Sequence, residues 1–232
     1  MSQKIEVKHE IICLFDLIRR VEQGNIRIPT FHQPFAWERA QICELMDSIC
    51  NHYPIGSLLL WNTDGNFRCR DSIGPILLKN IAQNRVNLVL DGQQRLTSLF
   101  GTLRMPSTEN LNGAQDPDPG RWCIYFNAER QIFEHLDAPN TTPREFHFPL
   151  WAVMDTFAFL TETERMRKGT REETGQRYIK RVQEVVRALN NYMVPLTTIE
   201  NTHFSQAVTI LTRLNGKGGV AILNASDFSH AP

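Results

Sequence analysis

The chain has 232 residues, of which 41% are hydrophobic, so it can bury the core of one large domain, and wholesale disorder is excluded. Lys and Arg together number 25, as do Asp and Glu, so the formal net charge is zero. A generally basic DNA-binding surface is thereby excluded, because each phosphate contact needs a cation, and any DNA contact must be a local patch or lie in another part of the protein.

The first predicted elements are a strand and a helix. The sequence IRIPTF at residues 26–31 predicts a strand, and Pro29 favours an edge position because proline donates no backbone hydrogen bond. A helix is predicted over residues 37–53, and Pro54 and Gly56 end it. Its apolar residues recur at three- and four-residue intervals: Ile42, Leu45, Met46, Ile49 and Tyr53.

Two continuously apolar strands and a second helix follow. The sequences GSLLLWN at 56–62 and VNLVL at 86–90 are typical of strands buried on both faces. The second of these strands leads into Asp91-Gly92 and a helix over 93–103. One face of this helix carries Leu96, Leu99, Phe100 and Leu103. The sequence therefore predicts an α/β fold, in which residues 1–105 form a small core.

The second half of the chain has a different texture. Residues 106–120 are rich in Pro, Asn, Asp and Gly and predict a loop. Residues 121–232 predict a mixed and then mainly helical region that completes the domain. Its predicted elements are a strand at 122–127, a helix at 171–193 with Tyr178, Val182, Val185, Val186 and Leu189 on one stripe, a strand at 193–200, and a helix at 205–215 closed by Gly216, Gly218 and Gly219. The ending NASDFSHAP is unlike a finished core element, so we expect a longer protein.

The cysteines and the N-terminal sequence indicate the compartment. The five cysteines form no Cys-x-x-Cys pair and have no histidine at zinc-finger spacing, so we interpret them as structural thiols of a reducing cytoplasm. The start MSQKIEVKHEI is charged, and no apolar run approaches membrane-spanning length. We therefore expect a cytoplasmic protein with no membrane partner.

The chemistry concentrates where the strand at 86–90 becomes the helix at 93–103. Asp91 ends the strand close to the helix N-cap, and Gly92 permits a sharp turn. Gln93, Gln94 and Arg95 occupy the first helical turn, where free N–H groups and the helix dipole favour an anion. The Arg95 guanidinium matches phosphate oxygens, and the two amides can contact a base or sugar or orient a water. Asp91 can hold Mg²⁺ beside the phosphates or polarise that water.

A simpler interpretation of this segment stays open. Asp91 would then only cap the helix, and Arg95 would only pair with a surface acid, since polar residues in a first helical turn are ordinary.

A second polar and aromatic cluster lies between the first strand and helix, in IRIPTFHQPFAWERAQ. It contains His32, Gln33, Phe35, Trp37 and Gln41. In the simpler interpretation the two aromatic residues anchor the core and His32 is a hydrogen-bonded, half-buried residue. Both clusters, however, fall at strand-to-helix junctions, which converge on the ligand crevice in open α/β sheets.

Several strings in the sequence resemble one known family. IRIPTF with the following aromatic residue and Trp37, YPIGSLLLW at 53–61 and LVLDGQQRLTSL at 88–99 resemble the N-terminal domain of GmrSD-type modification-dependent restriction enzymes, a domain shared with the phosphorothioation-sensing protein SspE. A weaker match is ILTRLNGKGG at 210–219, similar to the family's helix ending in Arg-x-Asn and a glycine turn. The resemblance spans residues 26–219.

The resemblance implies a ParB/sulfiredoxin-like mixed-sheet core followed by a mainly helical region. It implies nucleoside triphosphate hydrolysis, with Mg²⁺, in a defence system that acts on phage DNA, and a His-Asn-His nuclease domain or subunit that cuts the DNA. The implied nucleotide site consists of Asp91, Gly92, Gln93, Gln94 and Arg95, with Arg213, Asn215 and Lys217 as further candidates.

The sequence also departs from the family pattern. The family commonly has Gln-Arg where this chain has His32 and Gln33, so a cation for phosphate or DNA is missing there unless His32 is protonated. No nuclease motif is present in these residues, so DNA cleavage is not assigned to this chain.

We expect a nucleotide-binding and hydrolysing sensor domain of a modification-dependent DNA restriction protein, with modified DNA and further copies of the chain as candidate partners. The alternatives are a non-catalytic DNA-recognition module, in which Phe31, His32 and Phe35 test a modified group, and a degenerate family member kept as an assembly or regulatory piece.

Overall fold

The structure is a computed structural model, and it describes residues 5–64, 67–78, 85–104, 118–136 and 142–214. Asn215 and Lys217, two of the predicted ligand contacts, lie outside the described residues, as do the predicted closing glycines and most of the predicted 106–120 loop.

The main sheet has five strands in the order β1-β10-β3-β6-β2. It is mixed: β10 runs parallel to β3 and β2 parallel to β6, while the β1–β10 and β3–β6 pairs are antiparallel. The strands are β1 (Glu6–Cys13), β2 (Ile26–Arg27), β3 (Leu58–Thr63), β6 (Val86–Asp91) and β10 (Met193–Glu200). Since β10 pairs between β1 and β3, the sheet takes strands from both 1–105 and 121–232.

Helices cover the two faces of this sheet unequally. The larger core lies on one face and contains side chains of five α-helices, whereas the smaller core on the other face contains α6. The five helices are α1 (Leu14–Glu22), α2 (Arg39–Cys50), α3 (Gln93–Leu103), α4 (Thr156–Lys168) and α5 (Glu172–Asn191), and α6 is Phe204–Leu214. The strand residues alternate between these cores, with Val89 in the larger and Leu88 and Leu90 in the smaller.

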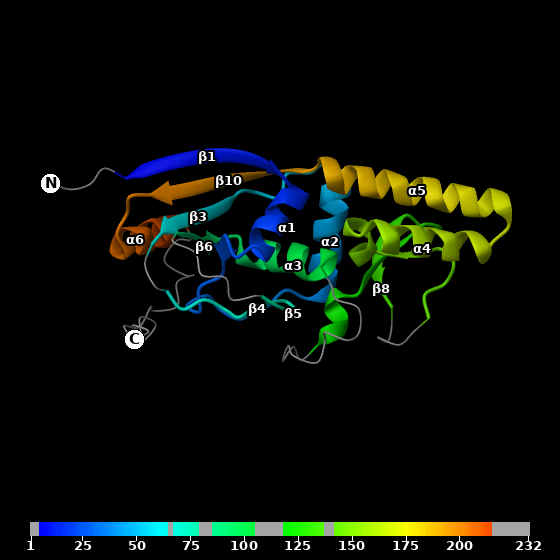
Figure 1. Cartoon of the computed structure of the whole chain (residues 1–232), viewed down its shortest axis with the longest axis horizontal. Helices are drawn as coiled ribbons and strands as arrows, with labels where there is room; N and C mark the ends of the chain where they lie inside the picture. Colours follow the sequence, from blue (N-terminus) through cyan, green and yellow to red (C-terminus); the bar gives the residue numbers. More distant parts are fainter. Residues whose placement is uncertain (1–4, 65–66, 79–84, 105–117, 137–141, 215–232) are drawn as a thin grey trace.

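A second, three-stranded antiparallel sheet lies at the other end of the elongated molecule, beside α4 and α5 (Figure 1). Its order is β8-β7-β9, and α2 packs against β8. The remaining elements are β4 (Ser72–Ile73), β5 (Ile76–Leu77), β7 (Ile124–Asn127), β8 (Ile132–His135), β9 (His147–Pro149) and the 3₁₀ helices η2 (Pro119–Trp122) and η3 (Leu150–Met154).

The predicted α/β class is confirmed, and so are its main elements. The helix at 93–103 and the strand at 193–200 have the predicted bounds. β3 lies at the centre of the sheet and is almost entirely buried, as its continuous apolar run predicted. Helices dominate after Pro149, where η3, α4 and α5 follow one another.

Several predicted elements differ in extent, three of them as follows. The strand predicted over 26–31 ends at Arg27, because Pro29 forms only an isolated bridge to Cys69, although β2 does lie at the sheet edge as predicted. The first helix stops at Cys50, so Tyr53 is outside it and 59% exposed, which contradicts its placement on the apolar face. The strand predicted at 122–127 begins only after η2.

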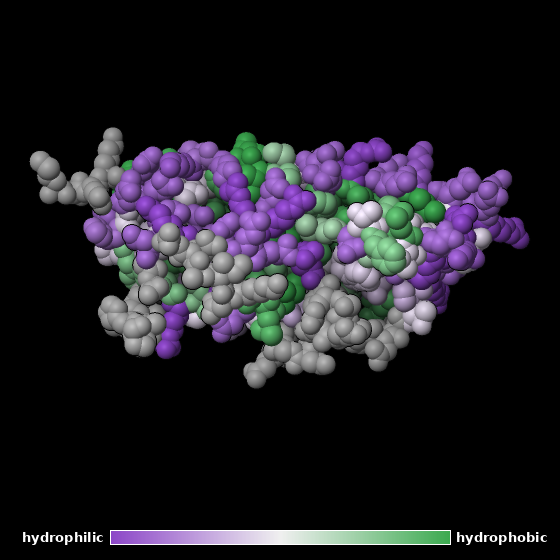
Figure 2. Space-filling view, viewed as in Figure 1, coloured by the Kyte–Doolittle hydropathy of each residue, from purple (hydrophilic) through white to green (hydrophobic). Residues whose placement is uncertain are grey.

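The N-terminal strand and helix, β1 and α1, were not predicted. Helix α1 carries apolar residues at helical spacing, and all four are fully buried: Leu14, Leu17, Ile18 and Val21. Hydrophilic side chains cover the outer side of α5 (Figure 2), as its predicted stripe required. Among the described residues, no helix combines the length and apolarity that a membrane span requires.

Candidate functional site

The centre of the site is an ion pair between Asp91 and Arg95. Arg95 Nη2 lies 3.3 Å from Asp91 Oδ2, and the side chains are 44% exposed for Asp91 and 19% for Arg95. Strand β6 has an irregular register opposite the Leu59–Leu60 step, immediately before Asp91. Irregularities of this kind redirect the side chains at the end of a strand. The charges that the sequence placed next to each other therefore face the same way and remain accessible to a ligand.

Gly92, rather than Asp91, is the N-cap of α3. Its φ of 92° is left-handed, and no side chain caps the helix, so the simpler interpretation of Asp91 as a cap is wrong. The first helical bond runs from Leu96 N to Gly92 O. The backbone N–H groups of Gln93, Gln94 and Arg95 precede this bond and have no carbonyl partner within the helix. They lie next to the Asp91–Arg95 pair.

The Arg95 guanidinium is held by the segment that leads into β3. Its Nη1 donates to Ile55 O over 2.7 Å. A Cβ atom on Gly56 would lie 2.7 Å from Arg95 Nη1, so only glycine lets this backbone approach so closely. The strings YPIGSLLLW and DGQQR, which are far apart in sequence, thus meet at this guanidinium.

The two glutamines hold a loop in place. We call residues 28–38, between β2 and α2, the anchored loop. Gln94 Oε1 accepts from Ala36 N over 3.0 Å and Gln94 Nε2 donates to Pro34 O over 3.3 Å. Gln93 is 7% exposed, and its Nε2 donates to Gln33 O over 3.1 Å. Both side chains therefore position the anchored loop beside the ion pair, a role that the sequence did not reveal.

His32 links the anchored loop to β6. Its Nε2 donates to Val89 O over 2.6 Å, so this nitrogen carries a proton, because a carbonyl oxygen can only accept. Burial lowers the pKa of His32 below its ordinary value, the bond to Val89 raises that pKa, Arg70 lowers it and Asp91 raises it. His32 is thus disfavoured as a replacement for the cation that the family pattern has here and this chain lacks, and the Gln33 side chain is exposed.

The lowered pKa of His32 predicts a pH-dependent stability. Above pH of about 6.5 the ring is neutral in both the folded and unfolded states. As the pH falls below that value the unfolded state binds the proton first, so the free energy of unfolding decreases until the folded state also binds it. We expect His32→Gln, which keeps an N–H donor, to reduce the slope of the free energy of unfolding against pH. The reduction corresponds to at most one proton taken up on unfolding, and urea unfolding from pH 7.5 down to pH 5 measures it.

The control is His203→Gln, because His203 is exposed and lies outside the anchored loop. His135, whose pKa burial also lowers, contributes in both variants. Identical pH profiles for wild type and His32→Gln would contradict the assignment of a neutral, partly buried His32.

An open hollow of about 510 Å³ adjoins the anchored loop. Its aromatic side chains, Phe35 and Trp37, also pack against the main core, which confirms their predicted anchoring role. Arg39 crosses the hollow's edge to Asp118, with bonds of 2.6 and 2.9 Å. The residues lining the hollow are Phe35, Ala36, Trp37, Glu38, Arg39, Ala40, Asp118 and Arg121.

The structure does not bring Arg213 to this site. Arg213 is exposed in the last turn of α6, and α6 packs on the face of the sheet opposite to α3. No contact between Arg213 and the Asp91–Arg95 pair is found within the described part of the chain.

A cysteine–histidine pair beside α2 does not have the properties of a nucleophilic dyad. Cys43 Sγ lies 3.4 Å from His135 Nδ1, and His135 Nε2 donates to Arg121 O over 2.8 Å. Burial raises the pKa of the Cys43 thiol to about 11 and lowers the pKa of His135. The thiol therefore stays protonated, unlike an activated nucleophile. All five cysteines are free thiols.

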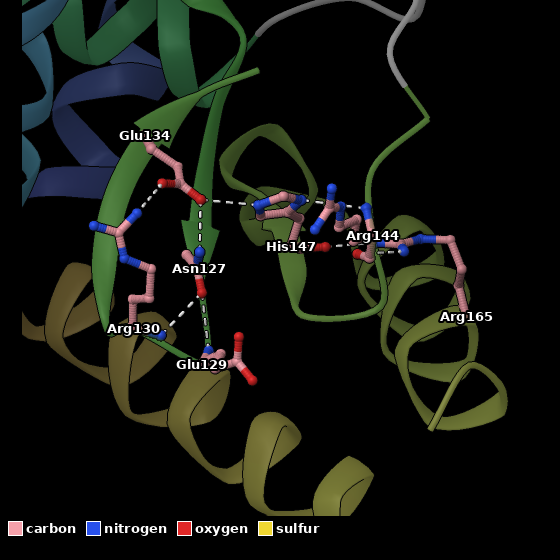
Figure 3. A network of polar contacts seen from close by, with 7 residues as sticks. All are labelled: Asn127, Glu129, Arg130, Glu134, Arg144, His147 and Arg165. Atoms are coloured by element: carbon pink, nitrogen blue, oxygen red, sulfur yellow. Dashed lines mark hydrogen bonds and ion pairs between the residues drawn. The ribbon is translucent and has the colours of Figure 1, made fainter. Parts of the chain in front are cut away.

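A polar network in the three-stranded sheet braces that sheet (Figure 3). His147 is 6% exposed, its Nδ1 accepts from Arg144 N over 3.2 Å, and its Nε2 donates to Glu134 Oε1 over 2.8 Å. Asn127 Nδ2 donates to the same oxygen over 2.6 Å. Arg165 donates to His147 O from α4. Because both ring nitrogens of His147 bind the protein itself, this network is structural.

The only predicted metal ligand is Asp91. Within the described residues, no group of three or more His, Cys, Asp or Glu side chains is placed to hold a metal ion. Asp91 alone fits a Mg²⁺ that takes its other ligands from phosphates and water, which is how Mg²⁺ usually binds at phosphate-transfer sites.

Comparison with known proteins identifies close similarity to one family. The family model of the GmrSD restriction endonuclease N-terminal domain matches residues 14–228. The chain is also 32% identical over 111 residues to the uncharacterized protein MJ0686 of Methanocaldococcus jannaschii. That alignment covers 44% of this chain and only 19% of the relative, so the chain corresponds to a small part of it.

Proposed function

Because the chain belongs to the GmrSD restriction endonuclease N-terminal domain family, we propose that its Asp91–Arg95 corner binds and hydrolyses a nucleoside triphosphate as the sensor of a cytoplasmic DNA-restriction system. The observation that supports this most directly is the accessible Asp91–Arg95 pair at the start of α3. A guanidinium and free helical N–H groups favour a phosphate, and the adjacent carboxylate favours the metal that accompanies it.

The corner assigns a role to each charged group. Arg95 donates to oxygens of the terminal phosphate, and the first N–H groups of α3 add further donors. Asp91 would hold Mg²⁺ together with the phosphates, and the ion would supply positive charge beside the transferring phosphoryl group. Gln93 and Gln94 act as positioning residues, since their amides hold the anchored loop. The nucleobase of the nucleotide occupies the hollow beside the anchored loop, against Phe35 or Trp37.

One observation favours a second candidate function. Gln94 uses both amide atoms, and Gln93 uses its amide nitrogen, to bind the anchored loop. This leaves few groups to orient an attacking water, as suits a corner that grips a DNA phosphate without hydrolysis. In either function, a nuclease domain or subunit elsewhere supplies DNA cleavage.

The test is a phosphate-release screen of the four nucleoside triphosphates, with and without modified DNA. We expect Asp91→Asn to retain nucleotide binding and to lose hydrolysis by at least about a hundredfold, because the amide cannot hold Mg²⁺ or polarise a water as the carboxylate does. Binding is measured separately by calorimetry.

The matched control is Asp16→Asn, which removes another carboxylate paired with an arginine, at 3.0 Å from Arg19 in α1. Hydrolysis by Asp91→Asn at the wild-type rate would refute the role of Asp91. Absence of phosphate release from every nucleotide, together with DNA affinity that falls steeply with salt, would instead support the DNA-gripping function.

A further inference from the structure

The main sheet ends at β1, and the outer side of this strand is open. β1 lies along the outer border of the molecule (Figure 1). Its eight residues pair with β10 without a register shift, from Glu6 opposite Glu200 to Cys13 opposite Met193. None of the described strands pairs with its other side. A regular strand of this length with one unpaired side is a template for a further strand.

The open side of β1 presents the backbone N–H and C=O groups of its odd-numbered residues. Directly after the strand, Leu14 N donates to Tyr192 O over 2.9 Å, in the register of the β1–β10 pair. Backbone groups of an antiparallel strand point alternately to either side, so the even-numbered residues of β1 face β10. A partner strand must therefore offer donors and acceptors opposite Val7, His9 and Ile11.

The side chains of these three odd-numbered residues lie on the α6 face of the sheet. Val7 is opposite Ile199, which belongs to the smaller core on that face. Val7 is nevertheless 50% exposed and Ile11 66% exposed, and Met193 beside them in β10 is 50% exposed. An exposed apolar strip along an unpaired strand is typical of a surface that another protein chain covers.

The other face of β1 carries charges of alternating sign. Lys8 pairs with Glu200 at 2.6 Å, and Glu10 pairs with Arg20 at 2.5 Å. The Lys8 and Glu10 side chains are still 56% and 46% exposed, so each can take a further partner. A lysine on an edge strand opposes pairing with most other strands. A partner strand must therefore place an acid opposite Lys8 and a base opposite Glu10.

A second copy of β1 meets all these requirements in one antiparallel register. With His9 opposite His9 of the second copy, odd-numbered residues face each other, Lys8 lies opposite Glu10, and Val7 lies opposite Ile11. A twofold axis repeats both pairs. A shift by one step to either side, which also matches the odd-numbered residues, places Lys8 opposite Lys8 or Glu10 opposite Glu10. Like charges directly opposite each other destabilise a sheet.

We propose that two copies of the chain join at their β1 edges, so that the two main sheets become one continuous sheet. The occupant is a second copy because the order of charges along β1 is complementary to itself. On the helix-covered face, each dimer contact extends the described ion pairs into a row of alternating charge, from Glu200 and Lys8 to Glu10 and Arg20 of the second copy. Two strands, β10 and β3, separate β1 from the strand that ends at Asp91, so the inference does not depend on the proposed function.

Sedimentation equilibrium of the full chain tests the proposal. We expect wild type to form a dimer that dissociates on dilution. Lys8→Glu should raise the dissociation constant about tenfold or more, because two attractive pairs become two repulsive ones. Glu10→Lys should do the same for the same reason. The matched control is Lys168→Glu, which removes another exposed lysine paired with an acid, Glu164 in α4, and should leave the dissociation constant unchanged.

An equimolar mixture of Lys8→Glu and Glu10→Lys separates the interface from damage to the fold. The first variant carries acids at both positions and the second carries bases, so a heterodimer has opposite charges in both pairs. We expect the mixture to dimerise about as tightly as wild type. Each substitution removes one exposed ion pair, which contributes little to folding, and recovery in the mixture excludes misfolding as the cause of the loss.

Three outcomes would overturn the proposal. The first is a wild-type chain that stays monomeric up to about 0.1 mM, a concentration at which even a weak specific dimer forms. The second is Lys8→Glu that dimerises as wild type does. The third is a mixture of the two charge variants that dimerises no more tightly than either variant alone.

Discussion

Replacing Arg95 with alanine should lower nucleotide affinity about a hundredfold or more, which is the loss of roughly 2–3 kcal/mol from charge-assisted bonds to phosphate. The guanidinium is the one strong cation of the Asp91–Arg95 pair, and its side chain is 19% exposed beside the first turn of α3. Calorimetric titration of each nucleoside triphosphate measures the loss. Undiminished binding of every nucleotide would remove the basis of the proposed function.

The same substitution also affects stability, which the sequence alone did not indicate. It leaves the Ile55 carbonyl without the donor that lies 2.7 Å away, at a cost of about 1–3 kcal/mol. The ion pair to Asp91 adds little, because Asp91 is 44% exposed and solvent screens the charges. Binding must therefore be measured well below the lowered melting temperature.

Two further variants separate the binding role of Arg95 from its structural role. Arg95→Lys keeps the charge and loses the planar fork, so we expect an intermediate affinity. Arg104→Ala removes another arginine at the opposite end of α3, where it pairs with Glu22, and should leave nucleotide affinity unchanged. An equal loss of affinity in Arg95→Ala and Arg104→Ala would indicate a general effect on α3.

Local patterns in the sequence predicted much of the fold. The helix at 93–103 and the strands β3 and β6 have strong apolar patterns, and the structure confirms them. The pairing of β10 between β1 and β3 depends on contacts between distant segments, which no local pattern contains. For the same reason the strand prediction ran past Arg27, where β-forming residues continue but the pairing with β6 ends and only an isolated bridge from Pro29 to Cys69 follows.

The relative positions of the candidate site residues were predicted in part, and the contacts show why. The sequence indicated that Asp91 and Arg95 lie on one strand-to-helix turn, because their separation of four residues is local. It did not indicate that the glutamine amides face the anchored loop, or that Arg70 reaches the same loop from the other side. The motifs that suggested a ligand site thus also contact one another. Ile55 O accepts a hydrogen bond from Arg95, and Pro34 O accepts one from Gln94.

Replacing Gly92 with alanine should destabilise the protein by about 2–5 kcal/mol, a large part of the total stability of a domain. The φ of Gly92 is 92°, which an L-residue adopts only with strain. A Cβ at this position would also overlap Leu58 Cδ2, and Leu58 is 1% exposed in the central strand β3. Urea unfolding measures the change, and a loss below about 1 kcal/mol would contradict both causes.

The double variant Gly92→Ala/Leu58→Val separates steric overlap from backbone strain. Valine lacks the overlapping Cδ2, so the cost of Gly92→Ala should be smaller in the Leu58→Val background, and the difference measures the overlap. The Cβ would still lie 3.2 Å from Arg95 Nη2, so the guanidinium must shift by a few tenths of an ångström beside Asp91. We therefore expect the double variant to recover part of its stability without recovering nucleotide affinity. Recovery of both together would mean that Gly92 serves the packing of α3 on β3 alone.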